Sequence, residues 1–295
     1  MNRNHHLAGI GFGLLAYGIW GFFPLYFRQL SHISPMDVLS NRAVWGCIFV
    51  TLLLTLRQGW GKVLAVFKTP RQLAMLALAA LLVGSNWLMF LWAVANQQVV
   101  ASSLGYFLTP LVNVLLGLVV LKERLNKLEW ISVGLALAAI ANEVISLGSL
   151  PWVSLFLAAT FGTYGLVRKQ VPVDAISGLW LETLAMLPVC GIYALWMAQS
   201  GHQVFVPNDG LTATLLIGAG ILTALPLMFF AAATQRLDLA TVGMLMYINP
   251  TMQFITAIWI FGEPLQTARL VSFGLIWSGL LIFSWSMWQK LRRAS

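Results

Sequence analysis

Charged residues in this chain are confined almost entirely to short gaps between long apolar stretches. Only 9% of the residues are charged, whereas 59% are hydrophobic. The uninterrupted stretches 7–27 and 99–121 are each long enough to cross a hydrocarbon core of roughly 30 Å as a helix. Lipid offers no partner to a bare backbone N–H or C=O, so only helices and closed barrels span it. Strand-type alternation is absent, and the pattern therefore predicts an all-α polytopic membrane protein.

The same pattern predicts ten transmembrane helices. Their expected ranges are 7–27, 36–56, 72–94, 99–121, 128–147, 152–168, 176–198, 211–231, 239–261 and 267–288. The third and fourth spans are separated only by residues 96–98, so the chain must reverse within a very short turn there. The apolar run near the N-terminus is too long for a signal peptide and lacks a cleavage site, so we expect it to remain as the first span.

The basic residues indicate the orientation of these spans. With the N-terminus inside, nearly all of the 17 lysines and arginines fall on the inner side. The exceptions are Arg28 and Arg269 in outer segments and Arg42 within a span. The positive-inside rule then places both termini of this multi-pass protein in the cytoplasm. Because this rule and contact with lipid headgroups account for the +8 net charge, the expected partner is the bilayer, with no nucleic acid.

The chain also contains an internal repeat, whose halves we place at 1–148 and 149–295. When the fourth and fifth spans are aligned with the ninth and tenth, chemically distinctive residues coincide: Pro110 with Pro250, Glu123 with Glu263, Ser132 with Ser272 and Gly134 with Gly274. Each half holds five spans, so the second half enters the membrane from the opposite side. Inverted repeats of this kind are typical of secondary transporters that work by alternating access.

Two Pro-x12-Glu segments, LTPLVNVLLGLVVLKERL and INPTMQFITAIWIFGEPL, resemble the EamA-type domains of the drug/metabolite transporter superfamily. The stretches GIGFGLLAYGIWGFFPLYFRQL and VGSNWLMFLWAVANQQVVASSLGYFLTPLVNVLLG resemble its RarD subgroup, which is named for chloramphenicol sensitivity. The resemblance implies a ten-helix inner-membrane transporter built from two five-helix repeats, with a small drug or metabolite as substrate. One departure is that Glu263 is followed by proline, whereas Glu123 is followed by arginine.

Each repeat contains a helix face that carries a proline and, one turn later, a carboxamide. The faces consist of Ser103, Tyr106, Pro110, Asn113 and Gly117 in one half and Gly243, Met246, Pro250, Gln253 and Ala257 in the other. A proline within a helix frees a backbone carbonyl, and carboxamides both donate and accept hydrogen bonds. Asn113 and Gln253 are therefore candidates for a wall of the substrate pathway, with interhelical packing as an equal alternative. For Ser103 and Gly117 packing is favoured.

Further polar and aromatic residues lie within the spans and are weaker candidates for the pathway. The polar ones are Asn86, Tyr247 and Asn249. Tyr17 and Trp20 in the first span align with Phe161 and Tyr164 in the sixth. Aromatic rings near span centres could pack a planar substrate. Ordinary core or lipid-facing packing is the favoured interpretation of these rings.

Arg42 and Glu182 are the sharpest candidates, because each is a charged residue several positions inside a span. They are equivalent in the two repeats, but their expected depths, each about 9 Å from opposite surfaces, argue against a direct ion pair. We expect Arg42 to face a cavity or to pair with Asp37 or Glu143, and Glu182 to pair with Arg168 or Lys169. Snorkelling to the interface is the alternative. Glu123 and Glu263 lie at span ends, where hydrogen bonding to a helix end is the favoured role.

The sequence contains no catalytic, metal or cofactor motif. All four histidines lie in termini or loops, no span pairs two carboxylates, and no phosphate-binding loop is present. We therefore expect a non-enzymatic secondary transporter without cofactor, driven by the gradient of its substrate or by protons, with Glu182 as the best proton carrier. An intramembrane sensor or scaffold without flux is the alternative, and an intramembrane enzyme is a weaker one. The sequence gives no indication of oligomeric state.

Overall fold

The computed structural model describes residues 3–120, 122, 125–205, 209–234, 236–237 and 245–294. All regular structure in these ranges is helical, as expected for segments that must satisfy their own backbone groups in lipid. The helices are α1 (Arg3–Gly21), α2 (Phe23–Arg28), α3 (Pro35–Leu56), α4 (Trp60–Phe67), α5 (Pro70–Ala95), α6 (Val99–Val120), α7 (Lys127–Leu147), α8 (Trp152–Lys169), α9 (Ala175–Ala198), α10 (Gly210–Thr234), α12 (Ile248–Ile255) followed by the π-helix η1 (Thr256–Ile260), and α13 (Thr267–Ala294).

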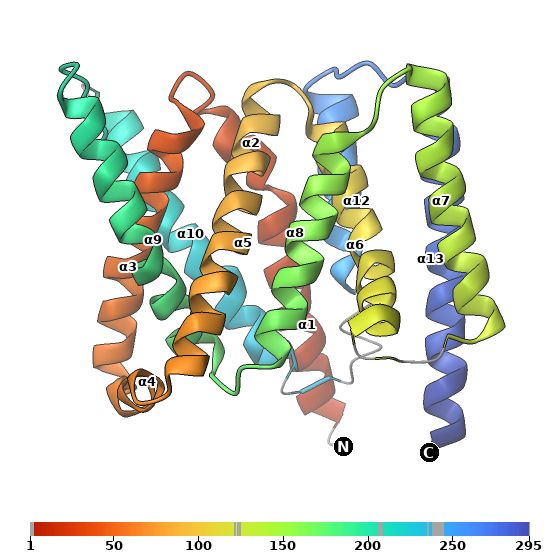
Figure 1. Ribbon diagram of the computed structural model, residues 1–295, viewed down its shortest axis with the longest axis horizontal. Coiled ribbons are helices and arrows are strands. Elements are labelled where there is room, and N and C mark those ends of the chain that lie inside the picture. The colour runs from red at the N-terminus through yellow and green to blue at the C-terminus, as the bar shows by residue number, and fades with distance from the viewer. Residues whose placement is uncertain are drawn as a thin grey trace.

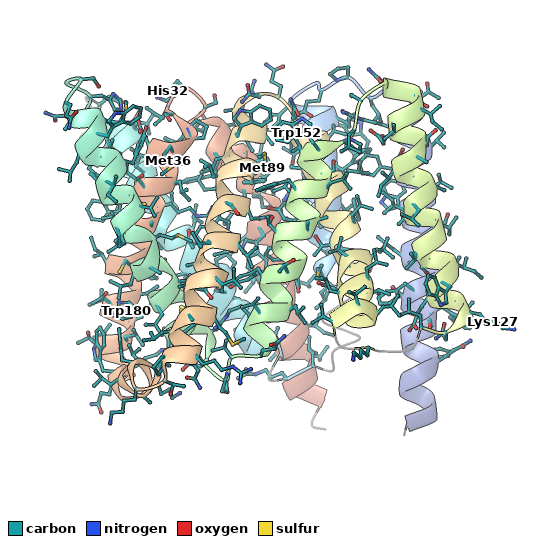
Figure 2. All side chains as sticks on the ribbon, viewed as in Figure 1. His32, Met36, Met89, Lys127, Trp152 and Trp180 are labelled. Atoms are coloured by element: carbon teal, nitrogen blue, oxygen red, sulfur yellow. The ribbon has the colours of Figure 1, made fainter. Side chains whose placement is uncertain are left out.

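The long helices run roughly parallel to one another in a layer that is more than one helix deep, and their connections lie on its two faces (Figure 1). The start of α1 and the end of α13 lie on the same face, which we call the terminal face. In Figure 2 Trp180 and Lys127 lie toward the terminal face, whereas His32 and Trp152 lie near the opposite face. Tryptophans near both faces are typical of interfacial aromatic belts.

Among the described residues, eight candidate membrane spans are long and apolar enough to cross a bilayer. They are Leu7–Arg28, Pro35–Leu56, Pro70–Ala95, Val99–Val120, Lys127–Ser146, Ala175–Ala198, Gly210–Phe230 and Thr267–Ser286. The expected span 152–168 coincides with α8, and the described part of 239–261 contains α12 and η1, but neither is among these eight. The predicted boundaries of the second to seventh spans lie within two residues of the observed ones, whereas the expected first span is divided into α1 and α2, and α13 extends to Ala294. The short turn between α5 and α6 contains Gln97 with a positive φ of 55°.

One helix was not expected from the sequence. The segment assigned to a loop at 57–71 contains α4, which lies along the terminal face (Figure 1). Val63 and Val66 are buried in a core cluster that includes residues of α3, α5 and α9, whereas Lys62 is exposed. The helix is too short to span a membrane and is amphipathic, so it lies on the protein at the edge of the layer.

Helices from the two halves of the chain pack mainly against each other. The main partnerships are α7 with α13, α6 with α8, α10 with both α1 and α3, and α8 with α5. Close approach depends on small residues: a Cβ at Gly220 of α10 would lie 2.5 Å from the backbone nitrogen of Gly46 in α3. Gly105 of α6 is equally restricted, because a Cβ there would lie 2.7 Å from the carbonyl oxygen of Ser154 in α8. These contacts follow the packing rule for membrane helices, in which small residues let backbones approach.

Candidate substrate pathway

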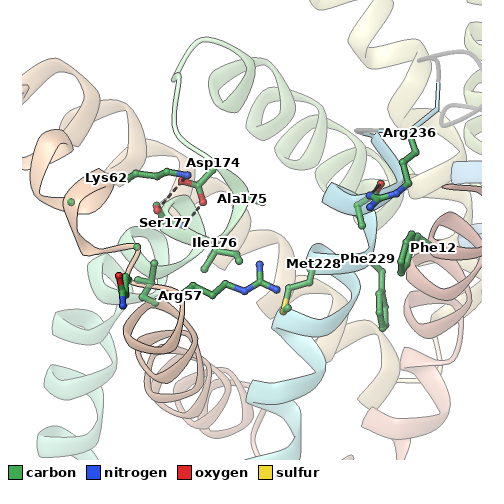
Figure 3. Close-up of a pocket in the computed structure, with 15 residues that line it drawn as sticks. Phe12, Arg57, Lys62, Asp174, Ala175, Ile176, Ser177, Met228, Phe229 and Arg236 are labelled. Atoms are coloured by element: carbon green, nitrogen blue, oxygen red, sulfur yellow. Dashed lines mark hydrogen bonds and ion pairs between the residues drawn. The ribbon is translucent and has the colours of Figure 1, made fainter. Parts of the chain in front are cut away.

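A cavity of about 800 Å³ opens among α1, α3, α4, α9 and α10. We call this cavity the vestibule, and its residues come from the terminal-face ends of these helices. Its lining includes Phe12, Leu54, Arg57, Lys62, Asp174, Ile176, Ser177, Met228, Phe229 and Arg236 (Figure 3). The first three helices belong to one half of the chain and the last two to the other, so the vestibule lies between the halves.

The charged groups of the vestibule are three basic side chains and one carboxylate. Lys62 lies 3.7 Å from Asp174, and Arg236 lies over the ring of Phe12 at 5.1 Å (Figure 3). Asp174 also caps α9, because its carboxylate accepts hydrogen bonds from the backbone N–H and the hydroxyl of Ser177. Partial burial works to raise the pKa of Asp174, but these hydrogen bonds and Lys62 outweigh it and hold the pKa below its usual 3.8. The carboxylate is therefore ionised at neutral pH, and the vestibule carries a net positive charge.

A second, much smaller cavity of about 10 Å³ lies deeper between α3, α9 and α10. It shares Ile176 and Met228 with the vestibule and is further lined by Val50, Leu227 and Ala224. Ala224 follows Thr223, which contacts Arg42. The small cavity is therefore an apolar extension of the vestibule between α3, α9 and α10.

The Arg42 guanidinium is buried near the middle of the helix layer. Its Nε–H donates to the hydroxyl of Thr223 at 2.6 Å, and the side chain is 3% exposed. Thr223 lies close to the centre of α10, so the guanidinium does not reach back to the interface as snorkelling would require. The ring of Trp87 lies 4.0 Å from the guanidinium carbon, and those of Phe27 and Phe23 lie at 5.4 and 5.5 Å. We call Arg42, Phe23, Phe27, Trp87 and Thr223 the aromatic box.

The two carboxylates expected as partners of Arg42 lie elsewhere, so that prediction was wrong. Asp37 accepts a hydrogen bond from Tyr193 at 2.6 Å and lies 2.7 Å from the ring of His202. Glu143 lies 3.6 Å from Arg269. Both are tied to groups near the face opposite the terminal face, whereas the Arg42 side chain extends away from that face to Thr223.

The expectation that Glu182 pairs with a nearby basic residue is confirmed. One carboxylate oxygen lies 3.2 Å from Nε of Arg168, and the other accepts a hydrogen bond from the hydroxyl of Tyr164 at 3.2 Å. Glu182 is 1% exposed. The alternative partner Lys169 belongs to α8, but its side chain lies outside the described part of the structure. Arg42 and Glu182 are thus held by different groups, and the ionic interactions of the described residues do not join them.

Asn86 and Tyr106 form one polar network within the layer. The Tyr106 hydroxyl donates to Oδ1 of Asn86 at 3.1 Å. Asn86 in turn donates from Nδ2 to the Leu157 carbonyl and the Thr160 hydroxyl. The network links α5, α6 and α8, and it satisfies Asn86 almost completely. Its evident role is to fix these three helices, although Tyr106 remains partly exposed.

The two carboxamides that the repeat relates occupy different environments. Asn113 is exposed and borders Gly162 of α8. Gln253 is 2% exposed; it donates to Asn249 at 2.8 Å and accepts from Ser102 at 3.3 Å. Packing is therefore the role that the contacts of Gln253 support. Neither residue lines the vestibule.

The prolines on these faces differ as well. Pro110 lies within α6, and Pro250 lies in the first turn of α12. Ser103 donates to the carbonyl of Pro250 at 2.8 Å, in agreement with the packing role favoured for Ser103. Gly243, from the second face, lies outside the described residues.

The remaining candidates are largely packed against other side chains. Tyr17 is buried, and its ring and that of Trp20 each lie 6.1 Å from Phe230. Tyr247 is partly buried against the largest core cluster. These contacts fit the core-packing interpretation that the sequence favoured for the aromatic residues.

The motif glutamate Glu263 caps the start of another helix and does not line the vestibule. Its two carboxylate oxygens accept hydrogen bonds from the backbone N–H groups of Val99 and Val100, each at 2.8 Å. The favoured role in helix-end bonding is confirmed for Glu263, which caps α6 from the other half of the chain. Its repeat equivalent, Glu123, lies outside the described residues.

Sequence reasoning missed Thr223 and Trp87, which hold Arg42, and it treated Arg57, Lys62 and Arg236 only as markers of orientation. Thr223 and Trp87 are one polar and one aromatic residue among many in the spans, so only the spatial proximity to Arg42 distinguishes them. Across the described residues, groups of histidine, cysteine, aspartate or glutamate that could hold a metal ion are absent.

Comparisons with known proteins agree with a membrane transporter. The EamA-like transporter family matches residues 7–142. A transporter from Vibrio cholerae is 42% identical, over 94% of this chain and 91% of the relative. The protein RarD of Escherichia coli is 39% identical, over the full length of both chains. A solved crystal structure with 19% sequence identity matches with a TM-score of 0.58, over 94% of this chain and 96% of that one, and supports the fold alone.

The apolar helices and these full-length relatives lead to the same assignment: the chain is a multi-pass membrane protein that belongs to the EamA-like transporter family, in its RarD-type branch.

Proposed function

We propose that this protein is a secondary transporter that moves a small molecule across the inner membrane by alternating access. The observation that carries the proposal is the vestibule, which lies between the two halves of the chain. A buried arginine, Arg42, lies farther along the same helices α3 and α10 and contacts Thr223 near the centre of α10. Binding sites of secondary transporters lie near the midplane, at the interface between repeats. An ionisable residue at that depth is a functional candidate by default.

The orientation we propose places the terminal face in the cytoplasm. The basic residues Arg57, Lys62, Lys127 and Arg236 belong to this face, where the vestibule also opens. The positive-inside rule favours the cytoplasm for such a face. The conformation is then one that is open inward, with both chain ends cytoplasmic.

The architecture we propose is ten spans in two inverted repeats, 1–148 and 149–295. In this arrangement α8 and the α12–η1 segment are added to the eight clearly apolar spans, which gives ten. Support comes from the equivalent positions of Arg42 in α3 and Glu182 in α9, two helices that pack against each other. Each charge lies seven residues beyond the first residue of its helix.

The opposite face is closed by contacts between the same two halves. Gly46 and Gly220 bring α3 and α10 together near the middle of these helices, and Asp37 at the start of α3, toward the opposite face, is held by Tyr193 and His202. Opening of this face would require these contacts to separate while the vestibule closes. The buried Glu182 carboxylate, held by Arg168 and Tyr164, is our candidate for proton coupling during that exchange.

Cysteine labelling in intact cells and inverted vesicles would test alternating access. Cys47 and Cys190 are replaced first, and a single cysteine is then placed at Ile176 in the vestibule or at Ser40, which is buried in α3 toward the opposite face. We expect a polar thiol reagent to label Ile176→Cys only from the cytoplasm and Ser40→Cys only from outside. A cysteine at Ile192, which is 69% exposed on an apolar helix, is the lipid-facing control.

A static scaffold would leave Ser40→Cys unlabelled from either side, and a channel would admit the reagent to both positions from one side. Either pattern would contradict the proposal. Flux itself is measured by screening metabolites and antibiotics, chloramphenicol included, for uptake by inverted vesicles with and without the protein.

A further inference from the structure

Arg42 is a buried basic group without a carboxylate partner among the described residues, whereas three buried acids each lie beside a basic side chain. Glu182 pairs with Arg168, Glu143 with Arg269, and Asp37 with His202. Within the described ranges, no carboxylate lies within ion-pair distance of Arg42, although it is only 3% exposed. A buried charge without a partner destabilises a fold, so its presence calls for a compensating role.

The hydrogen-bond donors of Arg42 are only partly used. Its Nε–H donates to Thr223 at 2.6 Å, whereas Nη1 has no acceptor among the described residues. A guanidinium carries its donors in its plane, in a fork that matches the two oxygens of a carboxylate. An unused donor on this fork marks the edge at which an anion could bind.

The aromatic rings stabilise the cation but supply no acceptor to the buried Nη1. Trp87 lies 4.0 Å from the guanidinium carbon, and Phe23 and Phe27 lie farther away. Cation–π contacts involve the ring face and the charge, and they provide no acceptor for an N–H group. The aromatic box therefore offers an apolar wall beside an unsatisfied, permanently charged donor.

The charge of the vestibule favours anions. The vestibule carries Arg57, Lys62 and Arg236 against a single carboxylate, Asp174. A cleft lined mainly by one sign of charge concentrates small molecules of the opposite sign. The smaller cavity then continues between α3 and α10 to Ala224, next to the threonine that holds Arg42.

We propose that the aromatic box binds the carboxylate of a small organic anion, with Arg42 at the charged end and Trp87, Phe23 and Phe27 against the apolar end. This inference rests on the proposed transport function and narrows its substrate class to monocarboxylates with an apolar or aromatic body.

Ligand binding to the purified protein tests the inference without requiring transport. The probes are three matched pairs: benzoate with benzamide, phenylacetate with phenylacetamide, and indole-3-acetate with indole-3-acetamide. The readout is the concentration of each that gives half-maximal thermal stabilisation in detergent. We expect at least one acid to act at a concentration about tenfold or more below that of its amide, as expected for a charge-assisted hydrogen bond.

Substitutions then locate the site. Arg42→Met should weaken binding of the acid by about 10- to 100-fold and abolish the preference over the amide. Arg42→Lys should recover only part of it, because an ammonium lacks the planar fork. Thr223→Val leaves the charge in place but frees Nε, and we expect a smaller, several-fold effect. Arg71→Met, which removes an exposed positive charge outside the box and the vestibule, should leave the preference unchanged.

Three results would overturn the inference: equal binding of acid and amide, an unchanged preference in Arg42→Met, or no stabilisation by any acid. Arg42→Met should fold, because it leaves no opposite charge unpaired and the Thr223 hydroxyl still donates to the Ala219 carbonyl. Flux of the best binder in vesicles separates this inference from the proposed function. Transport of an amide without binding of acids would retain the transporter and reject the anion site. Binding of an acid that is never transported across the membrane would retain the anion site and reject the transport function.

Discussion

The Nε atom of Arg168 lies 3.2 Å from a carboxylate oxygen of Glu182, in a pair whose acidic side chain is almost completely buried. Removing either partner leaves the other charge in an apolar environment. We expect Glu182→Ala and Arg168→Met each to lower the free energy of unfolding by about 3 kcal/mol or more. The double variant should be less destabilised than the sum of the two.

Unfolding of the three variants in one detergent provides the double-mutant cycle. Tyr164→Phe is the matched control, because it removes only the hydrogen bond to the other oxygen of Glu182 and should have a smaller effect. Strict additivity of Glu182→Ala and Arg168→Met would mean that the pair is not energetically coupled.

Glu263 provides a second stability prediction, because it caps α6 through the N–H groups of Val99 and Val100. Glu263→Ala should destabilise the protein by about 1–3 kcal/mol. Glu263→Gln keeps one acceptor oxygen and should lose less. Glu129→Gln makes the same change at the start of α7, where the capping residues Asn126 and Glu129 are close in sequence, and it serves as the comparison.

The same residue predicts a pH dependence. Burial raises the pKa of Glu263 above its usual 4.5, although the N–H groups of Val100 and Val99 and the nearby Arg269 and Arg28 oppose this. Because the folded pKa is the higher one, its contribution to stability is complete below the unfolded pKa and is lost as pH rises through the folded pKa. Stability of the wild type should therefore fall relative to Glu263→Gln as pH rises above about 4.5, in denaturant titrations at several pH values. The opposite slope would show that the ionised cap is favoured by folding.

The orientation has a simple test. A phosphatase fused after Gly201, in the connection between α9 and α10, should be active because this connection is expected outside. A fusion after Gly59, before α4 on the terminal face, should be inactive. The reverse activities would invert the assignment of the vestibule to the cytoplasm.

Helix positions were predictable from the sequence because one strong signal, apolar length, determines them. The expected span 152–168 and the observed α8, Trp152–Lys169, differ by one residue. Helix α4 was missed because its eight residues are too few to form a span, and their burial depends on packing against α5 and α9. Such a segment is defined by its neighbours rather than by its own hydropathy.

Side-chain partners were predictable only where they are close in sequence or lie at facing helix ends. Arg168 was among the expected partners of Glu182 because both lie near the short connection between α8 and α9. Arg42 instead reaches Thr223, in a helix from the other half, and no periodicity in α3 could have indicated which helix faces it. The expected depth of its Cα was reasonable, but the direction and length of the side chain placed the charge deeper.

Repeat symmetry was a poor guide to side-chain environment at Asn113 and Gln253. With a single cysteine at each position, Asn113→Cys should react with a small polar thiol reagent, because the position is exposed beside Gly162 of α8 and a polar residue within a span favours water over lipid. Gln253→Cys should react far more slowly, because Ser102 and Asn249 cover the position. Cysteines at Leu116 and Thr256, on other faces of the same helices, are the controls. Equal reaction at 113 and 253 would restore the symmetric pathway wall that the sequence suggested.

The two charges at equivalent positions of the repeats give the last prediction. Arg42 and Glu182 are held by different groups, so each should impair flux on its own when replaced by alanine, and the double alanine should be no better than either single variant. Exchange of the charges should abolish transport. In Arg42→Glu a carboxylate would face the ring of Trp87, whose negative π face disfavours an anion. In Glu182→Arg a second guanidinium would be placed against Arg168, and two like charges would be buried together. Recovery of flux in the exchanged variant, measured in vesicles with matched protein levels, would instead require the two residues to meet during the transport cycle.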